Sequence, residues 1–176
     1  NTPWYMKNIW QDLKKPIMVL APMDDVTDSA FRQLVAETAK PDLFFTEFAN
    51  VDGLFSPGIK TVMHKLFFTP EERPLIAQIW GNNPENYEKA AKVIVQMGFD
   101  GIDINMGCPE RSVMKKGSCA ALINNPELAK KIVDAVKKGA EGKLPISVKT
   151  RIGTNKIVTE EWIEFLLEQN LDTITI

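Results

Sequence analysis

Short apolar segments alternate with amphipathic helical patterns along this 176-residue chain, and no other feature constrains its fold as strongly. Each apolar segment has strand-like composition and is bounded by turn residues, as buried strands are. The six segments span residues 16–23, 42–49, 74–81, 101–108, 145–153 and 171–176. Strands that alternate with helices pair in parallel through right-handed crossovers, so the pattern predicts a doubly wound open sheet or a (β/α)₈ barrel.

The helical segments carry recognisable start and stop signals. Asn83 and Asn125 are each followed by proline and glutamate, which suit an N-cap, a first helical position and an acid near the positive end of the helix dipole. Gly98 and Gly139 follow the two amphipathic stretches and predict where these helices end. Two further amphipathic patterns cover residues 28–37 and 160–169.

The turn after the first strand distinguishes the two folds. A dinucleotide-binding open sheet needs Gly-x-Gly-x-x-Gly there, and residues 21–31 read APMDDVTDSAF instead. The sequence therefore predicts a (β/α)₈ TIM barrel. Such barrels typically take about 250 residues, so this chain is expected to hold only the first roughly six βα units. Because it ends within the strand pattern DTITI, we expect residues 1–176 to be the N-terminal part of a longer catalytic domain.

Composition and charge argue against several other classes of protein. The apolar runs are too short to span a bilayer, and the first ten residues lack the order of a signal peptide, so a cytoplasmic protein is expected. A net charge of −2 disfavours a chain that coats nucleic acid over its whole surface. Cys108 and Cys119 match neither a secreted disulfide framework nor a common zinc pattern, so no metal is expected.

Strand alternation assigns a set of polar side chains to the inside of the barrel. In the fourth and fifth segments the apolar residues are expected to face the helix layer, so the polar residues between them should point toward the barrel axis. These polar residues lie near the C-terminal ends of the strands, where barrel enzymes carry out chemistry. The inward residues are Gln78, Asp103, Asn105, Ser147, Lys149, Arg151 and, from a segment with two apolar faces, Glu47. The alternative is a buried structural network in which Lys149 and Arg151 pair with Asp103 and Glu47.

Cys108 lies at the rim above the fourth segment and is the candidate proton donor. Pro109 favours extended backbone before it, and Gly107 leaves room for a planar ligand. A thiol with an unperturbed pKa of about 8.5 is mostly protonated at neutral pH, which suits an acid better than a nucleophile. His64, the only histidine, is distant in sequence and expected at the surface, whereas Cys119 is expected to pack in the core.

Several motifs occur in an order and spacing that are specific to one family: APMDDVTDSAFR, TEF, AQIWG, DINMGCPERSVMKKGSCAALI and SVKTRIG. From Pro16 to Ile176 the sequence thereby resembles the dihydrouridine synthases, the flavin enzymes that reduce uridine in transfer RNA. The resemblance implies a TIM-barrel catalytic domain with FMN as cofactor, NADPH as electron donor and tRNA as substrate.

The resemblance also implies roles for matching residues. Pro22 and Met23 would supply backbone contacts to FMN. Gln78 would form a hydrogen bond to the isoalloxazine ring, and Lys149 would lie beside its N1 and O2 edge. Reduced flavin would pass hydride to C6 of uracil, and Cys108 would give a proton to C5.

Four residues are implied on the substrate side. Asn105 would hold the ring of the substrate or flavin, and Arg151 a substrate carbonyl or phosphate. Lys115 and Lys116, in the loop 111–117, would meet RNA phosphate as the loop closes over a flipped-out base. The alternative for this loop is a solvated basic segment without a ligand.

The chain lacks parts that the family places further along. These are the last two βα units, which carry the FMN phosphate site, and a C-terminal helical domain that binds tRNA. Residues 1–176 alone are therefore expected neither to bind FMN tightly nor to turn over.

Two rival functions remain open. One is an FMN barrel oxidoreductase of the dihydroorotate dehydrogenase type, which the basic MKKG loop disfavours. The other is a catalytically silent RNA-binding barrel, which the joint presence of Cys108, Gln78 and Lys149 disfavours.

Overall fold

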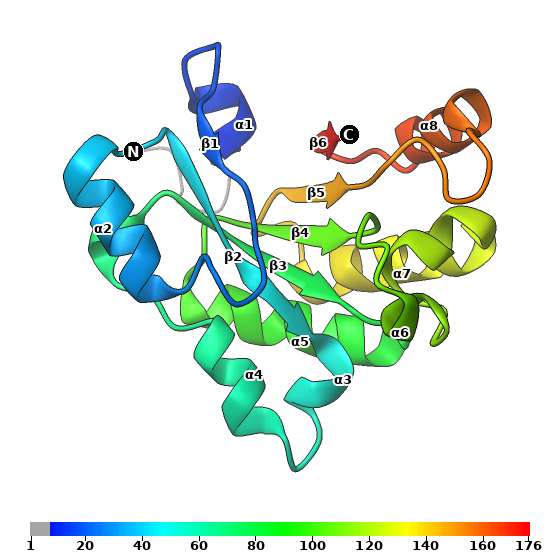
Figure 1. The fold of residues 1–176 in the computed structure, drawn as a ribbon, viewed down its shortest axis with the longest axis horizontal. Coiled ribbons are helices and arrows are strands. Elements are labelled where there is room, and N and C mark those ends of the chain that lie inside the picture. Colours follow the sequence, from blue (N-terminus) through cyan, green and yellow to red (C-terminus); the bar gives the residue numbers. More distant parts are fainter. Residues whose placement is uncertain (1–7) are drawn as a thin grey trace.

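A computed structural model of the chain describes residues 8–176 and contains one sheet of six parallel strands (Figure 1). The strands are β1 (Val19–Leu20), β2 (Leu43–Asn50), β3 (Leu75–Trp80), β4 (Gly101–Asn105), β5 (Ile146–Lys149) and β6 (Thr173–Thr175). Their spatial order follows the sequence. A doubly wound sheet reverses this order at its switch point, whereas a barrel keeps it. The predicted TIM-barrel topology is confirmed as a curled half-barrel. Residues 1–7, on which the prediction of no signal peptide partly rests, lie outside the described part.

Helices follow the strands on the outside of the curled sheet, and a short helix precedes β1. They are α1 (Ile9–Asp12), α2 (Ser29–Ala39), α3 (Val51–Leu54), α4 (Ile59–Lys65), α5 (Pro84–Met97), α6 (Arg111–Met114), α7 (Pro126–Ala140) and α8 (Thr159–Glu168), with 3₁₀ turns at Pro70–Glu72 and Cys119–Asn124. Within residues 8–176, no helix combines the length and apolarity needed to cross a membrane.

The predicted helix starts are confirmed. The Asn83 side chain accepts a hydrogen bond from the Glu85 N–H (3.0 Å), and the Asn125 side chain accepts one from the Leu128 N–H (3.2 Å). Both prolines occupy the first helical position, where no backbone donor is needed. Gly98 has a left-handed φ of 79° and ends α5 as predicted.

Gly139 does not end α7, contrary to the prediction. The helix continues through Ala140, and Glu141 takes the left-handed cap position with a φ of 53°. Gly139 instead lies where α7 crosses α5, because a Cβ at this position would be 2.3 Å from the carbonyl oxygen of Glu88. Close helix packing, which no local pattern reveals, requires this glycine.

Apolar residues cover the helix side of the sheet and the N-terminal part of its other face. On the helix side, Ile102, Ile104 and Val148 share one buried cluster with residues of α5 and α7, as strand alternation predicts. On the other face, near the N-terminal strand ends, Leu43, Phe45 and Ile76 form a second cluster against Ile9, and Trp10 and Leu13 of the N-terminal segment pack on it. Helix α1 therefore covers the bottom of the half-barrel and leaves the carboxyl ends of the strands for chemistry.

Candidate functional site

Polar side chains from β3, β4 and β5 meet inside the half-barrel. Asp103 pairs in register with Gln78 on one side and with Ser147 on the other, and Asn105 pairs with Lys149 one step further along. Gln78, Asp103 and Ser147 are fully buried. A polar cluster in this position needs internal hydrogen bonds, because water does not reach it.

A directional chain of hydrogen bonds joins these residues to the Cys108 loop. Ser147 Oγ donates to Asp103 Oδ1 (2.6 Å), and Gln78 Nε2 donates to Asp103 Oδ2 (2.7 Å). Asn105 Nδ2 then donates to Gln78 Oε1 (3.0 Å), and Asn105 Oδ1 accepts from the backbone N–H groups of Gly107 and Cys108 (both 3.0 Å).

An ionised carboxylate only accepts hydrogen bonds, so Asp103 determines how the amides of Gln78 and Asn105 are turned. The Gln78 oxygen faces Asn105, and the Asn105 oxygen faces the loop. One amide hydrogen of Gln78 has no partner within residues 8–176, although the side chain is fully buried. The cluster therefore orients both the Gln78 amide and the loop that contains Cys108.

Cys108 is partly exposed at the C-terminal end of β4. Its carbonyl oxygen accepts from the Ala120 N–H (3.2 Å), so the loop is held from both sides. A Cβ at Gly107 would lie 3.3 Å from the backbone of Thr150, so this glycine permits close packing of the two loops. Cys119 is buried, as predicted, and burial raises the pKa of its thiol.

The predicted pairing of Lys149 and Arg151 with Asp103 and Glu47 is absent from the described residues, although Asp103 does belong to a buried hydrogen-bond network. Asp103 is bound by Ser147 and Gln78, and no ion pair joins it to Lys149 or Arg151 in the described part of the chain. Glu47 instead binds Lys65 Nζ (3.4 Å) and the Asp25 N–H (2.7 Å). The reason is a register shift between Phe45 and Phe48 in β2, which interrupts the alternation used to assign Glu47.

Arg151 lies beyond the end of β5 and lines a cavity of about 490 Å³ between the loops that follow β4 and β5. Its buried Nε has no hydrogen-bond partner. Arg111 and Lys115 line the same cavity, whereas Lys116 does not. Exposed Lys116 instead accepts a hydrogen bond at its carbonyl from the Asn82 side chain. Arg151, Arg111 and Lys115 thus offer cations to one anionic group.

Pro22 and Met23 lie in the loop after β1, where Pro22 is half-buried and Met23 is exposed. The Met23 N–H already donates to Thr27 Oγ1 (3.0 Å), and Thr27 Oγ1 donates back to the Met23 carbonyl (3.0 Å). A ligand contact by the Met23 N–H would therefore have to displace Thr27. Exposed His64 lies on α4, as predicted.

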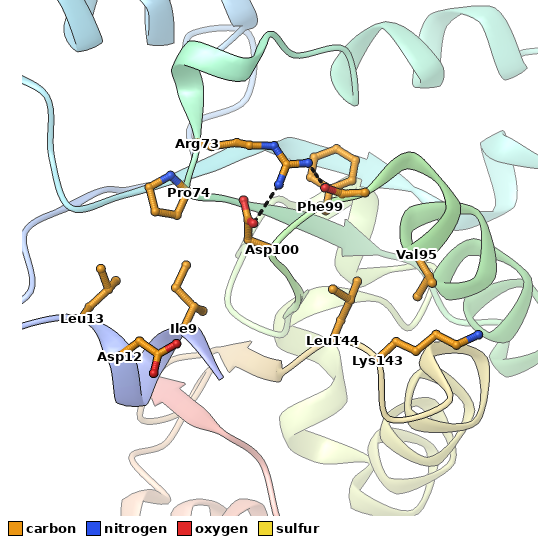
Figure 2. Close-up of a pocket in the computed structure, with 11 residues that line it drawn as sticks. Ile9, Asp12, Leu13, Arg73, Pro74, Val95, Phe99, Asp100, Lys143 and Leu144 are labelled. Atoms are coloured by element: carbon orange, nitrogen blue, oxygen red, sulfur yellow. Dashed lines mark hydrogen bonds and ion pairs between the residues drawn. The ribbon is translucent and has the colours of Figure 1, made fainter. Parts of the chain in front are cut away.

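A cavity of about 590 Å³ lies at the opposite end of the strands (Figure 2). Its lining comes from α1 and from the segments that lead into β3, β4 and β5. An ion pair between Arg73 Nη1 and Asp100 Oδ1 (2.8 Å) crosses its wall. No residue of the predicted site lines this cavity.

Replacing Asp103 with asparagine should remove a pH-dependent loss of stability. Burial raises the pKa of Asp103 to about 6, although hydrogen bonds from Ser147 and Gln78 and the charge of Lys149 act in the opposite direction. The folded protein therefore keeps a proton that the unfolded chain releases near pH 4. The free energy of unfolding should fall by about 3 kcal/mol as pH rises from about 4 to 6.

Urea unfolding of wild type and Asp103→Asn between pH 4 and pH 7 measures this effect. The wild type should lose stability relative to the variant as pH rises, because only the wild type must ionise the buried carboxyl group of Asp103. A difference between the two proteins that does not change with pH would contradict the expectation.

Comparison with known proteins identifies one family. Residues 19–176 match the family model for dihydrouridine synthase (Dus). The chain is 44% identical over 172 residues to a probable tRNA-dihydrouridine synthase of Staphylococcus aureus (strain COL). It is 43% identical over 172 residues to probable tRNA-dihydrouridine synthase 2 of Bacillus subtilis (strain 168). Each alignment covers 97% of this chain and 52% of the relative, so the chain spans about half the length of the curated relatives it matches.

Proposed function

The chain belongs to the dihydrouridine synthase family, and we propose that it forms the N-terminal part of an FMN-dependent oxidoreductase that reduces uridine in tRNA to 5,6-dihydrouridine with NADPH as reductant. In this proposal the complete protein also contains the remaining barrel units and a helical tRNA-binding domain. We call this complete protein the intact protein. A tRNA-modifying enzyme of this kind works in the cytoplasm.

The orientation of the Cys108 loop carries the proposal. Asn105 binds the two successive backbone N–H groups that lead into Cys108, and Asp103 sets the direction of that contact through Gln78. In this proposal Gln78 and Lys149 would contact one edge of a flavin. Gln78 has an uncommitted donor, and Lys149 has no carboxylate partner within residues 8–176.

The chemistry divides between the cofactor and this chain. FMN, when bound, supplies the hydride that uracil receives at C6. Cys108 donates its thiol proton to C5, which a protonated thiol at a fixed position does well. With FMN bound, Lys149 would stabilise negative charge on the ring, and Gln78 would donate a hydrogen bond to a ring acceptor. Pro22 and Met23 support the ring from the loop after β1.

The cavity beside the Cys108 loop supports RNA as the substrate. Arg151, Arg111 and Lys115 line it, and the buried Nε of Arg151 needs an acceptor that the described part of the chain does not provide. A uracil carbonyl or an RNA phosphate supplies one. Exposed Lys116 meets phosphate further out, and Asn105 contacts the substrate or flavin ring while it holds the loop.

Absorption spectra of the intact protein test this function. Purified protein supplied with FMN should show flavin bands that bleach on anaerobic addition of NADPH. The bands should return when tRNA lacking dihydrouridine is added, and dihydrouridine should appear in that tRNA. Fully modified tRNA is the matched control and should not reoxidise the flavin.

Three outcomes would argue against the proposal. Reoxidation by orotate in place of tRNA would favour an enzyme of the dihydroorotate dehydrogenase type. Protein that binds tRNA but never binds FMN would favour a silent RNA-binding barrel. Stoichiometric FMN on residues 1–176 alone would contradict the expectation that this chain holds only part of the flavin site.

A further inference from the structure

The loop between β1 and α2, which contains Pro22 and Met23, has a backbone conformation that needs external support. Asp25 has a φ of 56°, in the left-handed region that residues other than glycine rarely adopt. Such a residue keeps this conformation only where its surroundings hold it. Asp24 and Asp25 are both exposed, so packing within the loop does not supply that support.

Glu47 supports the backbone of Asp25 through a hydrogen bond. Its side chain is buried, and Oε1 accepts a hydrogen bond from the Asp25 N–H (2.7 Å). Glu47 lies within the register shift of β2 between Phe45 and Phe48, where side chains do not alternate regularly between the two faces of the sheet. A buried carboxylate is costly unless a cation or several donors compensate its charge.

Lys65, at the end of α4, supplies that cation. Its Nζ contacts Asp24 and lies 3.3 Å from Asp25 Oδ1 and 3.4 Å from Glu47 Oε1. Oxygen atoms of these three carboxylates all lie within 4.8 Å of one another. Carboxylates this close repel each other, and one ammonium group, only 20% exposed, neutralises part of their charge.

We propose that Lys65 is a positioning residue for cofactor binding, because it draws Asp24 and Asp25 onto Glu47 and so holds Pro22 and Met23 where FMN contacts them. This inference rests on the proposed function. Lys65 acts through the loop and needs no contact with substrate. The other end of the loop has its own support, since Thr27 holds Met23 through two hydrogen bonds.

Sequence patterns do not reveal Lys65. It lies in a short amphipathic segment 18 residues after Glu47 and 41 residues after Asp24. An ordinary surface ion pair contributes too little stability to define a loop. Here the partners include a buried carboxylate, and the same carboxylate binds the backbone of the strained residue, so loss of the ammonium group should displace the loop.

FMN titration of the intact protein and its Lys65→Met variant tests the proposal. The variant should bind FMN about tenfold more weakly, and Lys65→Arg should restore most of the affinity. Lys60→Met is the matched control, because Lys60 lies on the same helix and lines one pocket together with Lys65 and Glu47 but forms no ion pair within residues 8–176. Its FMN affinity should match that of wild type.

Two further measurements separate positioning from a general loss of structure. Adding Asp24→Asn and Asp25→Asn to Lys65→Met should recover part of the FMN affinity, because fewer carboxylates then repel each other. Without FMN, hydrogen exchange at the Asp25 amide should be faster in Lys65→Met than in wild type and unchanged in Lys60→Met.

Each failure has a distinct meaning. Wild-type FMN affinity in Lys65→Met, or unchanged exchange at Asp25, would overturn the positioning role whatever the enzyme does. Absence of FMN binding by the wild-type protein would overturn the proposed function, and the exchange measurement would still decide whether Lys65 holds the loop.

Discussion

Replacing Cys108 with alanine in the intact protein should lower the rate of dihydrouridine formation by about 10²–10⁴-fold, the range typical for loss of a general acid. The substitution removes the proton donor but leaves Asp103, Gln78 and Asn105 in place. FMN binding and flavin reduction by NADPH should therefore stay near wild type, and only the tRNA-dependent reoxidation should slow. Stopped-flow absorbance under anaerobic conditions separates the two half-reactions.

Cys119→Ala provides the matched control for this experiment. Cys119 is fully buried beside the site, where its thiol interacts with the Cys108 backbone and the neighbouring Ala120 N–H binds the Cys108 carbonyl. Its loss should reduce stability slightly and leave reoxidation by tRNA near the wild-type rate. Equal slowing in both variants would indicate a packing effect, and an unaffected rate in Cys108→Ala would remove this thiol from the mechanism.

Arg32→Met should reduce the free energy of unfolding by about 3–5 kcal/mol, the cost of removing one partner of a buried ion pair. Arg32 Nε and Glu72 Oε2 are 2.6 Å apart, and both side chains are fully buried. The guanidinium also donates to the carbonyl oxygens of Thr27 (2.5 Å) and Phe67 (2.8 Å). Methionine fills similar space but leaves these acceptors and the Glu72 charge without their donor.

Arg73→Met is the matched control, because Arg73 also pairs with a carboxylate but its side chain is 39% exposed. That variant should lose only about 1 kcal/mol, since water replaces much of the interaction. Urea unfolding of both variants measures the difference. The double variant Arg32→Met with Glu72→Met should recover part of the lost stability, because no buried charge then remains unpaired. If Arg32→Met and Arg73→Met lost the same free energy of unfolding, burial of the Arg32 ion pair would not increase its contribution to stability.

Most of the fold could be predicted because its signals are local. The strand segments, the Asn-Pro-Glu helix starts and the stop at Gly98 each depend on a few neighbouring residues. Together with the missing glycine motif they predicted a barrel, and the sequential strand order confirmed it. Gly139 was misassigned because a glycine that permits close helix contact is indistinguishable in sequence from one that ends a helix.

The candidate site could be predicted less completely. Alternation on β3, β4 and β5 brought Gln78, Asp103 and Asn105 into one group, and the hydrogen bonds join them. The partners of Glu47 could not be predicted, because they lie in the loop after β1 and on α4, and the register shift in β2 has no compositional signal. The roles assigned to these residues in binding and catalysis remain predictions.

By itself, the sequence determined which segments are strands and helices, in what order they pair, and which polar residues share the inner face of the sheet. These properties follow from hydrophobic periods of 2 and 3.6 residues and from capping, which act over a few residues. Only the tertiary structure decided how Asp103 orients the side-chain amides of Gln78 and Asn105 toward the cysteine loop. It also decided that Lys65 and Arg32 have buried carboxylate partners 18 and 40 residues away in the sequence. The physical reason is that a buried charged group pairs with whichever partner the fold brings within about 3 Å. The separation of the two residues along the chain has no influence on this pairing.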